Sequence, residues 1–105
     1  MTSLAIDIDK DRLRDFCRRW KVEEFALFGS VTRPDEFRED SDVDVLVRFS
    51  PDAPWSLLEW VTMEEELASI FHRPVDLVER AAVEGSDNRF RKGSILNSVV
   101  LLDVA

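Results

Sequence analysis

Apolar residues recur at helical spacing in two long stretches of the chain. Between residues 9 and 20 the pattern predicts an amphipathic helix, because residues three or four positions apart share one helix face. The apolar stripe of this helix is Leu13, Phe16, Cys17 and Trp20. A longer stripe over 55–71 predicts a second helix, and a weaker pattern over 88–97, interrupted by Gly93, predicts a third.

Runs of β-forming residues predict strands between and after these helices. Residues 22–28 are rich in β-branched and aromatic side chains and stop at Gly29, which predicts a strand that ends in a sharp turn. Over 42–47, valines alternate with Asp42, Asp44 and Leu46, the period of a strand with two different faces. Further strands are predicted over 75–78 and 99–104.

The order of these elements indicates the fold class. It is helix, strand, strand, helix, strand, helix, strand, with a loop or short helical turn over 31–41. Such alternation predicts an α/β (α+β) fold in which helices pack on a mixed sheet of the four strands. A chain of 105 residues has the usual size of one domain and is too short for two independent cores. We therefore expect a single domain over 1–105.

Composition and charge narrow the classes of function. A formal net charge of −8 argues against direct binding of nucleic acid, since that affinity comes from Lys and Arg neutralising phosphates. An acidic surface favours instead a basic macromolecular partner, or a cation held by carboxylates. No stretch is apolar enough to span a bilayer and the N-terminus has no leader pattern, so we expect a cytoplasmic protein with no membrane partner.

Two aspartates share one of the predicted strands. Residues two apart in a strand point to the same face, which places Asp42 and Asp44 ~7 Å apart at their Cα atoms. Their charges repel unless water screens them or a divalent cation lies between them, and carboxylate oxygens suit Mg²⁺ or Mn²⁺. Asp76, flanked by Val75 and Leu77 in another predicted strand, is the natural third member. Alone, an Asp-x-Asp pair is more often a solvated strand end.

The Gly29-Ser30 turn after the first strand is a second candidate for chemistry. Its backbone N–H groups can bind phosphate oxygens, although an ordinary turn is the commoner use of such a pair. A phosphate-binding turn and carboxylates on two further strands are together the parts that nucleotidyl transfer requires. That reaction displaces pyrophosphate from a nucleoside triphosphate, and two metal ions can stabilise the attacking and leaving oxygens. Asp76 would orient or deprotonate the acceptor.

Other conspicuous residues are given structural roles. Cys17 is expected in the core, and His72 is expected at the C-terminal end of the long helix. Trp55, in a loop bounded by prolines, is the tryptophan expected to be exposed. The run 64–66, all glutamate, is interpreted as solvated helix surface. A basic cluster is interpreted in the same way; its members are Arg89, Arg91 and Lys92.

The residues singled out above also carry a resemblance to a known family. Over about residues 8–104 the chain resembles the minimal nucleotidyltransferases of the polymerase-β superfamily. The matching segments are Phe28-Gly29-Ser30, Arg33, Ser41-Asp42-Val43-Asp44-Val45-Leu46-Val47 and Val75-Asp76-Leu77-Val78. The chain departs from the family at Pro34, where glycine is frequent, and proline fixes φ and removes a donor N–H.

The resemblance implies the nucleotidyltransferase fold, with ATP as substrate and Mg²⁺ as cofactor. It implies that the nucleotide is bound by Gly29, Ser30 and Arg33. It also implies that two Mg²⁺ ions are held by Asp42, Asp44 and Asp76.

The same resemblance implies a partner. Members of the family are usually encoded beside an all-helical HEPN protein, a ribonuclease-type toxin, and several transfer AMP from ATP to a tyrosine of that toxin. By resemblance, this chain is the antitoxin of such a pair. The alternative is a binding-only antitoxin, which neutralises its partner by contact without catalysis. A transferase for a small molecule is disfavoured, because 105 residues leave little room for an acceptor-binding domain.

Overall fold

The computed structural model describes residues 8–33, 35, 37–38, 41–53, 55–84 and 99–105. In chain order the elements are helix α1 (Lys10–Arg19), strand β1 (Val22–Phe28), 3₁₀ helix η1 (Gly29–Thr32), strand β2 (Val43–Phe49), helix α2 (Leu57–Phe71), strand β3 (Val75–Glu79), helix α3 (Arg80–Glu84) and strand β4 (Val100–Leu102). The predicted helix over 88–97, with its basic cluster, lies outside the described residues, as does Pro34.

The four strands form one mixed sheet in the order β3-β2-β1-β4. Strand β1 pairs antiparallel with β2 and with β4, whereas β2 and β3 pair in parallel. Parallel neighbours need a long crossover connection, which α2 supplies between β2 and β3. The predicted mixed sheet with helices packed on it is therefore confirmed.

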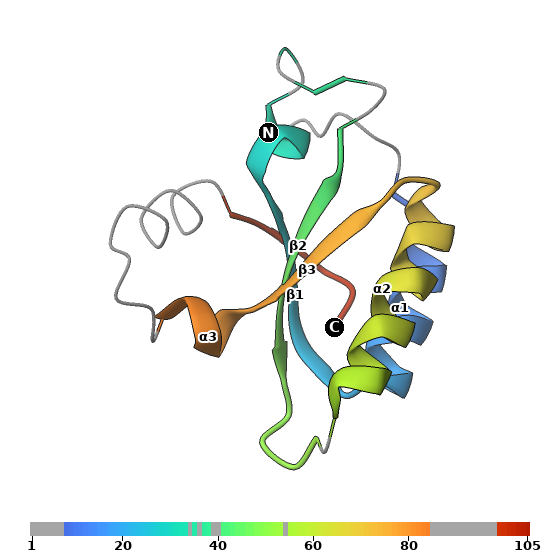
Figure 1. Cartoon of the computed structure of the whole chain (residues 1–105), viewed down its shortest axis with the longest axis vertical. Coiled ribbons are helices and arrows are strands. Elements are labelled where there is room, and N and C mark those ends of the chain that lie inside the picture. The colour runs from blue at the N-terminus through green and yellow to red at the C-terminus, as the bar shows by residue number, and fades with distance from the viewer. Residues whose placement is uncertain (1–7, 34, 36, 39–40, 54, 85–98) are drawn as a thin grey trace.

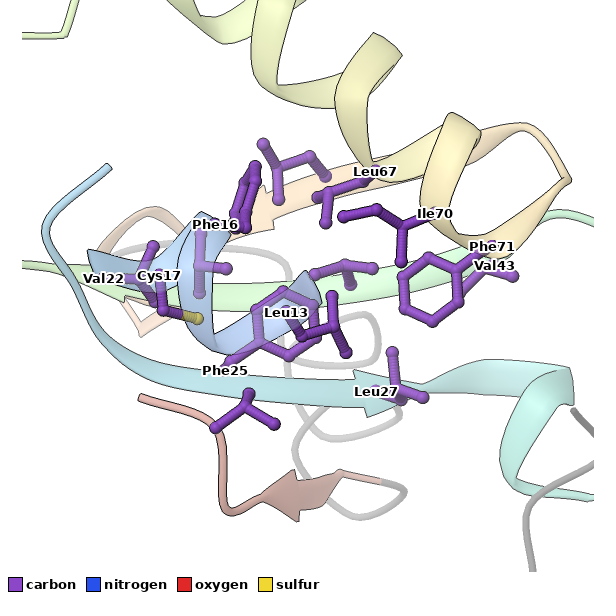
Figure 2. Packing of buried hydrophobic residues seen from close by; sticks show 14 of the residues in the cluster. Leu13, Phe16, Cys17, Val22, Phe25, Leu27, Val43, Leu67, Ile70 and Phe71 are labelled. Atoms are coloured by element: carbon purple, nitrogen blue, oxygen red, sulfur yellow. The ribbon is translucent and has the colours of Figure 1, made fainter. Parts of the chain in front are cut away.

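Helices α1 and α2 cover one face of this sheet, as Figure 1 shows. Alternation along β2 turns every second residue toward them, and these residues are buried. In Figure 2, side chains from both helices point toward the strands and meet them in one cluster. Labelled members are Leu13, Phe16 and Cys17 of α1, Leu67, Ile70 and Phe71 of α2, and Phe25, Leu27 and Val43 of the strands. Cys17 is in the core, as predicted.

The opposite face of the sheet carries a second, smaller apolar cluster. Its buried residues are Ala26, Phe28 and Leu46, with Val78 and Val99 packed against them. Leu46 and Val78 lie opposite one another on β2 and β3. Because side chains alternate between faces, Asp44 and Asp76, each two residues earlier, lie on this second face. The carboxylates therefore lie on the side of the sheet away from α1 and α2.

The helix ends follow local capping signals. The Asp9 side chain accepts a hydrogen bond from the Arg12 backbone N–H at 3.2 Å and so forms an acidic N-cap for α1. Helix α2 starts at Leu57, two residues after the predicted start, because Ser56 and Glu59 form a capping box there. Helix α3 was not predicted, since five residues are too few to show an apolar period. No helix among the described residues is long and apolar enough to cross a membrane.

Two surface expectations were wrong. Trp55 is half-buried: its Nε1 donates to the Trp20 carbonyl oxygen at 2.9 Å, and the two rings pack edge to face with centroids 5.1 Å apart. Glu66 is not simply solvated, because its carboxylate accepts from Trp20 Nε1 at 3.0 Å and pairs with Arg19. Indole N–H groups seek acceptors when buried, and both contacts join segments far apart in the sequence.

His72 caps the C-terminal end of α2, as predicted, and does so in the left-handed region with φ of 59°. An L-residue pays about 1 kcal/mol for this conformation, whereas glycine does not. We expect His72→Gly to raise the free energy of unfolding by about 0.5 kcal/mol, after allowance for the greater freedom of glycine in the unfolded chain. Urea titration of His72→Gly beside His72→Ala measures the effect. A glycine variant less stable than the alanine variant would contradict the prediction.

Candidate functional site

Two of the predicted aspartates lie directly opposite one another on neighbouring strands. Asp44 in β2 is the register partner of Asp76 in β3, and these strands run in parallel. Paired residues of neighbouring strands point to the same face of a sheet. Asp44 is half-buried and Asp76 is exposed. The register thus brings together two carboxylates that are separated by a whole helix in the sequence.

Asp42 occupies a different position from the one predicted. It was expected inside the strand with Asp44, but β2 begins at Val43, so Asp42 is an exposed residue immediately before the strand. It nevertheless lies close enough for its charge to act on Asp44. The structure therefore gathers all three predicted carboxylates at one end of β2 and β3.

The electrostatics of the cluster centre on Asp44. Burial raises the pKa of its carboxyl from 3.8 to about 6, with further contributions from the negative charges of Asp76 and then Asp42. Both causes disfavour the charged form, since the group loses water and faces like charges. A positive ion placed among the three carboxylates would offset these effects and favour the ionised form of Asp44.

Gly29 closes the site from the side of β1. It follows Phe28, which pairs with Asp44 in the β1–β2 ladder, and it has a φ of +75°. A Cβ atom built on Gly29 would lie 2.2 Å from Oδ2 of Asp44 and 3.2 Å from its Cγ. Only glycine accepts both the left-handed backbone and this close approach. The predicted turn and the predicted carboxylate are therefore in direct contact.

The chain from Gly29 to Thr32 forms the one-turn 3₁₀ helix η1, which begins two residues before the loop or short helical turn expected over 31–41 and overlaps that range only at its start. The Thr32 hydroxyl donates to the Gly29 carbonyl oxygen at 2.7 Å, and the Arg33 backbone N–H donates to the Ser30 carbonyl oxygen at 2.9 Å. Ser30 is half-buried within this turn, and Arg33 is exposed at its end. The three residues predicted to bind nucleotide therefore lie on one short, hydrogen-bonded segment beside Asp44.

The donor set suits a hard divalent cation. The candidate ligands are carboxylate oxygens from β2, from β3 and from the loop before β2, and Mg²⁺ takes such oxygen ligands in proteins. The close approach of Gly29 to Asp44 leaves no room for a larger residue at position 29. Among the described residues no group of three or more His, Cys, Asp or Glu side chains is already arranged around a common centre. The residues fit the ion by their chemistry.

Two residues near the site were not found by sequence reasoning. Glu64 of α2, interpreted as solvated, accepts a hydrogen bond from the Leu77 backbone N–H at 3.3 Å, next to Asp76. Among the described strands β3 is at the edge of the sheet, so this carboxylate gives a partner to a backbone N–H at that edge. Arg73, in the turn between α2 and β3, contacts the segment before Asp42. Helical periodicity says nothing about either contact, because both depend on tertiary approach.

Comparison with known proteins identifies the family of the chain. The family model of the nucleotidyltransferase domain matches residues 10–102. The chain belongs to this family. The nucleotidyltransferase is 41% identical over 75 residues to the protein adenylyltransferase MntA of Thermococcus cleftensis, a match that covers 71% of this chain and 70% of that protein.

Solved structures share the fold of the nucleotidyltransferase. A candidate minimal nucleotidyltransferase superposes with a TM-score of 0.66 at 29% identity, covering 89% of this chain and 88% of that chain. A chain from the complex of tri-AMPylated Shewanella oneidensis HEPN toxin with MNT antitoxin superposes with a TM-score of 0.57. That match covers 88% of this chain and 66% of the other, and at 17% identity it establishes the fold alone.

Proposed function

We propose that this nucleotidyltransferase is a Mg²⁺-dependent protein adenylyltransferase that moves AMP from ATP to a tyrosine of a HEPN toxin and so acts as its antitoxin. The observation that carries the proposal is the direct pairing of Asp44 with Asp76, with Gly29 against Asp44. The chemistry is supported by the relative named as a protein adenylyltransferase. The partner class is supported by the similar fold in a complex with an AMPylated HEPN toxin.

Each site residue has a role in this proposal. Asp42 and Asp44 would hold the Mg²⁺ ions, with Asp76 as a further ligand. Bound Mg²⁺ supplies charge neutralisation for the triphosphate and for the departing pyrophosphate. The nucleotide phosphates lie against the segment that carries Gly29, Ser30 and Arg33. Positioning and charge stabilisation are the main contributions of an enzyme to phosphoryl transfer of this kind.

Asp76 serves the acceptor side of the reaction. The tyrosine oxygen forms a bond to the α-phosphorus of ATP, the bond to the β-phosphate oxygen breaks, and the phenolic proton is lost. Asp76 is exposed and lies directly across from Asp44, so it can orient the tyrosine hydroxyl and accept its proton. AMP-tyrosine and pyrophosphate are the products.

Co-purification with a HEPN protein, the partner that the proposal requires, tests it. After incubation with Mg²⁺-ATP, intact-mass analysis is expected to show additions of AMP on the partner. The additions should disappear when Mg²⁺ is chelated, and with Asp44→Asn. Asp103→Asn is the matched control, because it removes one exposed carboxylate after β4. A wild-type mixture that gains no mass with Mg²⁺-ATP would contradict the proposed activity.

A binding-only antitoxin is the second candidate function. It is favoured by an exposed apolar surface at the start of α2, where Leu57 is 79% exposed and Leu58 is 77% exposed. Exposed apolar surface of this kind is typical of protein contact sites. The double variant Asp42→Asn with Asp44→Asn decides between the two functions in a growth assay with the toxin. Full neutralisation by the double variant would favour contact alone, whereas lost neutralisation would favour catalysis.

A further inference from the structure

Arg73 lies in the turn that joins α2 to β3 and reaches back to the segment that leads into β2. Its Nη1 donates to the carbonyl oxygen of Arg38 at 2.9 Å and to that of Ser41 at 3.3 Å. Its guanidinium carbon lies 4.4 Å from the centre of the Phe37 ring, a cation–π distance. One side chain therefore holds three residues from a distant part of the sequence.

The residues that Arg73 contacts are themselves hydrogen-bonded to each other. The Ser41 backbone N–H donates to the Arg38 carbonyl oxygen at 3.1 Å, and the Arg38 backbone N–H donates to the Ser41 hydroxyl oxygen at 2.9 Å. The guanidinium of Arg73 therefore binds the carbonyl groups of two residues, Arg38 and Ser41, that are also hydrogen-bonded to each other. Arg73 joins this pair to the turn that leads into β3.

Asp42 lies between two anchored neighbours. On one side Ser41 is held through its carbonyl by Arg73, and on the other the Val43 backbone N–H donates to the Pro74 carbonyl oxygen at 2.9 Å. Arg73 and Pro74 are adjacent and lead directly into β3, the strand of Asp76. A single turn therefore fixes both flanks of Asp42 and begins the strand that carries the third carboxylate.

We propose that Arg73 is a positioning residue, which places Asp42 relative to Asp44 and Asp76 and thereby sets the affinity of the site for a divalent cation. The inference rests on the proposed function, since it deepens the description of the same site. Asp44 and Asp76 are placed by the paired ladder of β2 and β3. Asp42 precedes β2, so its position depends on the turn that holds its neighbours.

The chemistry of the contact favours arginine over lysine. A planar guanidinium can donate to two carbonyl oxygens while its face rests on an aromatic ring, whereas an ammonium is a point charge that cannot do both. Arg73→Lys should keep the charge and part of the hydrogen bonding, and Arg73→Met should keep only the aliphatic bulk. The pair of variants therefore separates the geometry of the contact from its charge.

A calorimetric titration of the full chain with Mn²⁺ alone tests the positioning role. We expect Arg73→Met to weaken Mn²⁺ binding about tenfold, the scale of losses when the support of a metal ligand is removed. Arg73→Lys should fall between Arg73→Met and wild type. In the transfer assay, raising the Mn²⁺ concentration should restore much of the rate of Arg73→Met. A general loss of stability would not be relieved in this way.

Two control variants distinguish the positioning role of Arg73 from a general effect of losing a positive charge and from a general loss of stability. Arg18→Met removes one positive charge from an exposed position of α1, where Arg18 pairs with Asp15. Trp55→Phe removes the hydrogen bond to the Trp20 carbonyl and so weakens the fold on the helical face of the sheet. Both controls should bind Mn²⁺ as wild type does.

The outcomes distinguish this inference from the proposed function. Weaker Mn²⁺ binding in the Arg73 variants alone supports the positioning role. Unchanged binding in Arg73→Met, or an equal loss in Trp55→Phe, would overturn it while leaving the proposed function intact. A wild-type protein that binds no Mn²⁺ would contradict the proposed function and this role together.

Discussion

Gly29→Ala is expected to lower the rate of AMP transfer at least ~100-fold and to lower the free energy of unfolding by about 2 kcal/mol. Two causes act together. The backbone φ of +75° costs an L-residue about 1 kcal/mol or more. The new Cβ would also lie 2.2 Å from Oδ2 of Asp44, a separation that real atoms do not adopt. The Asp44 carboxylate must therefore move, and a displacement of about 1 Å at a reacting centre is enough for such a loss of rate.

A double-mutant cycle separates the two causes. Asp44→Ala removes Oδ2 and Cγ, so the nearest remaining atom to a Gly29 Cβ is the Asp44 Cβ at 3.6 Å, an ordinary contact. In that background Gly29→Ala should cost only the backbone part, about half of its cost in the wild type. Urea titration of the four proteins gives the coupling free energy. Additive effects would mean that the glycine is required for its backbone alone and not for the approach of Asp44.

The site was predictable where local pattern determines geometry. Alternation over 42–47 predicted that the valines share one face of the strand and that Asp44 lies on the other, and burial of Val43, Val45 and Val47 agrees. A glycine at the end of a predicted strand indicated a special backbone, and the positive φ of Gly29 agrees. In these cases the physical cause lies within a few residues, so the sequence alone carries the information.

The contacts between distant segments were not predictable in the same way. The register of β2 on β3, which sets Asp44 against Asp76, depends on how α2 spans the sheet. Glu64 and Arg73 have no local signal, because their hydrogen bonds reach the backbone of other elements. Trp55 was misjudged for the same reason: its partner, the Trp20 carbonyl, is supplied by the end of α1. Composition and residue spacing therefore do not show which backbone group each of these side chains contacts.

Asp44→Asn is expected to abolish AMP transfer and, without divalent cation, to make the protein more stable than wild type at neutral pH. Loss of activity follows from the loss of an anionic ligand at the centre of the cluster. The gain in stability follows from the pKa of Asp44, raised to about 6 by burial and by the charges of Asp76 and Asp42. Asparagine is neutral at every pH, so the variant never has to bury that charge.

The sign of the pH dependence follows from linkage. The pKa of Asp44 is higher in the folded protein, about 6, than its ordinary value of 3.8, so the folded state binds the proton more tightly. The stabilisation from this proton is complete below the unfolded pKa and is lost as the pH rises through about 6. Wild type and Asp44→Asn should therefore have similar stability near pH 4, diverge as the pH rises toward about 6, and differ by a constant amount above it.

The expected divergence is modest, because Asp44 is only half-buried and solvent screens part of the effect. We expect about 1 kcal/mol, or ~5 °C in Tm for a domain of this size. Thermal unfolding of both proteins with a chelator, at several pH values from about 4 to 8, measures it. Asp103→Asn, at the opposite end of β1 from Asp44 by register, controls for the loss of one negative charge. Parallel pH curves for wild type and Asp44→Asn would contradict the prediction.

Adding Mg²⁺ should then reverse the order of stability. A ligand that binds only the folded state raises the Tm, and the rise is larger when the ligand binds more tightly. The ion is expected to bind the ionised form of Asp44. Wild type should gain stability with Mg²⁺ above pH 6, where its carboxylate is charged, and should gain little near pH 4, where the carboxyl is protonated. Asp44→Asn should gain little at either pH. The negative charges that destabilise the metal-free protein are thus also the charges that attract the cation. An equal gain in Tm of wild type and Asp44→Asn with Mg²⁺ would contradict this prediction.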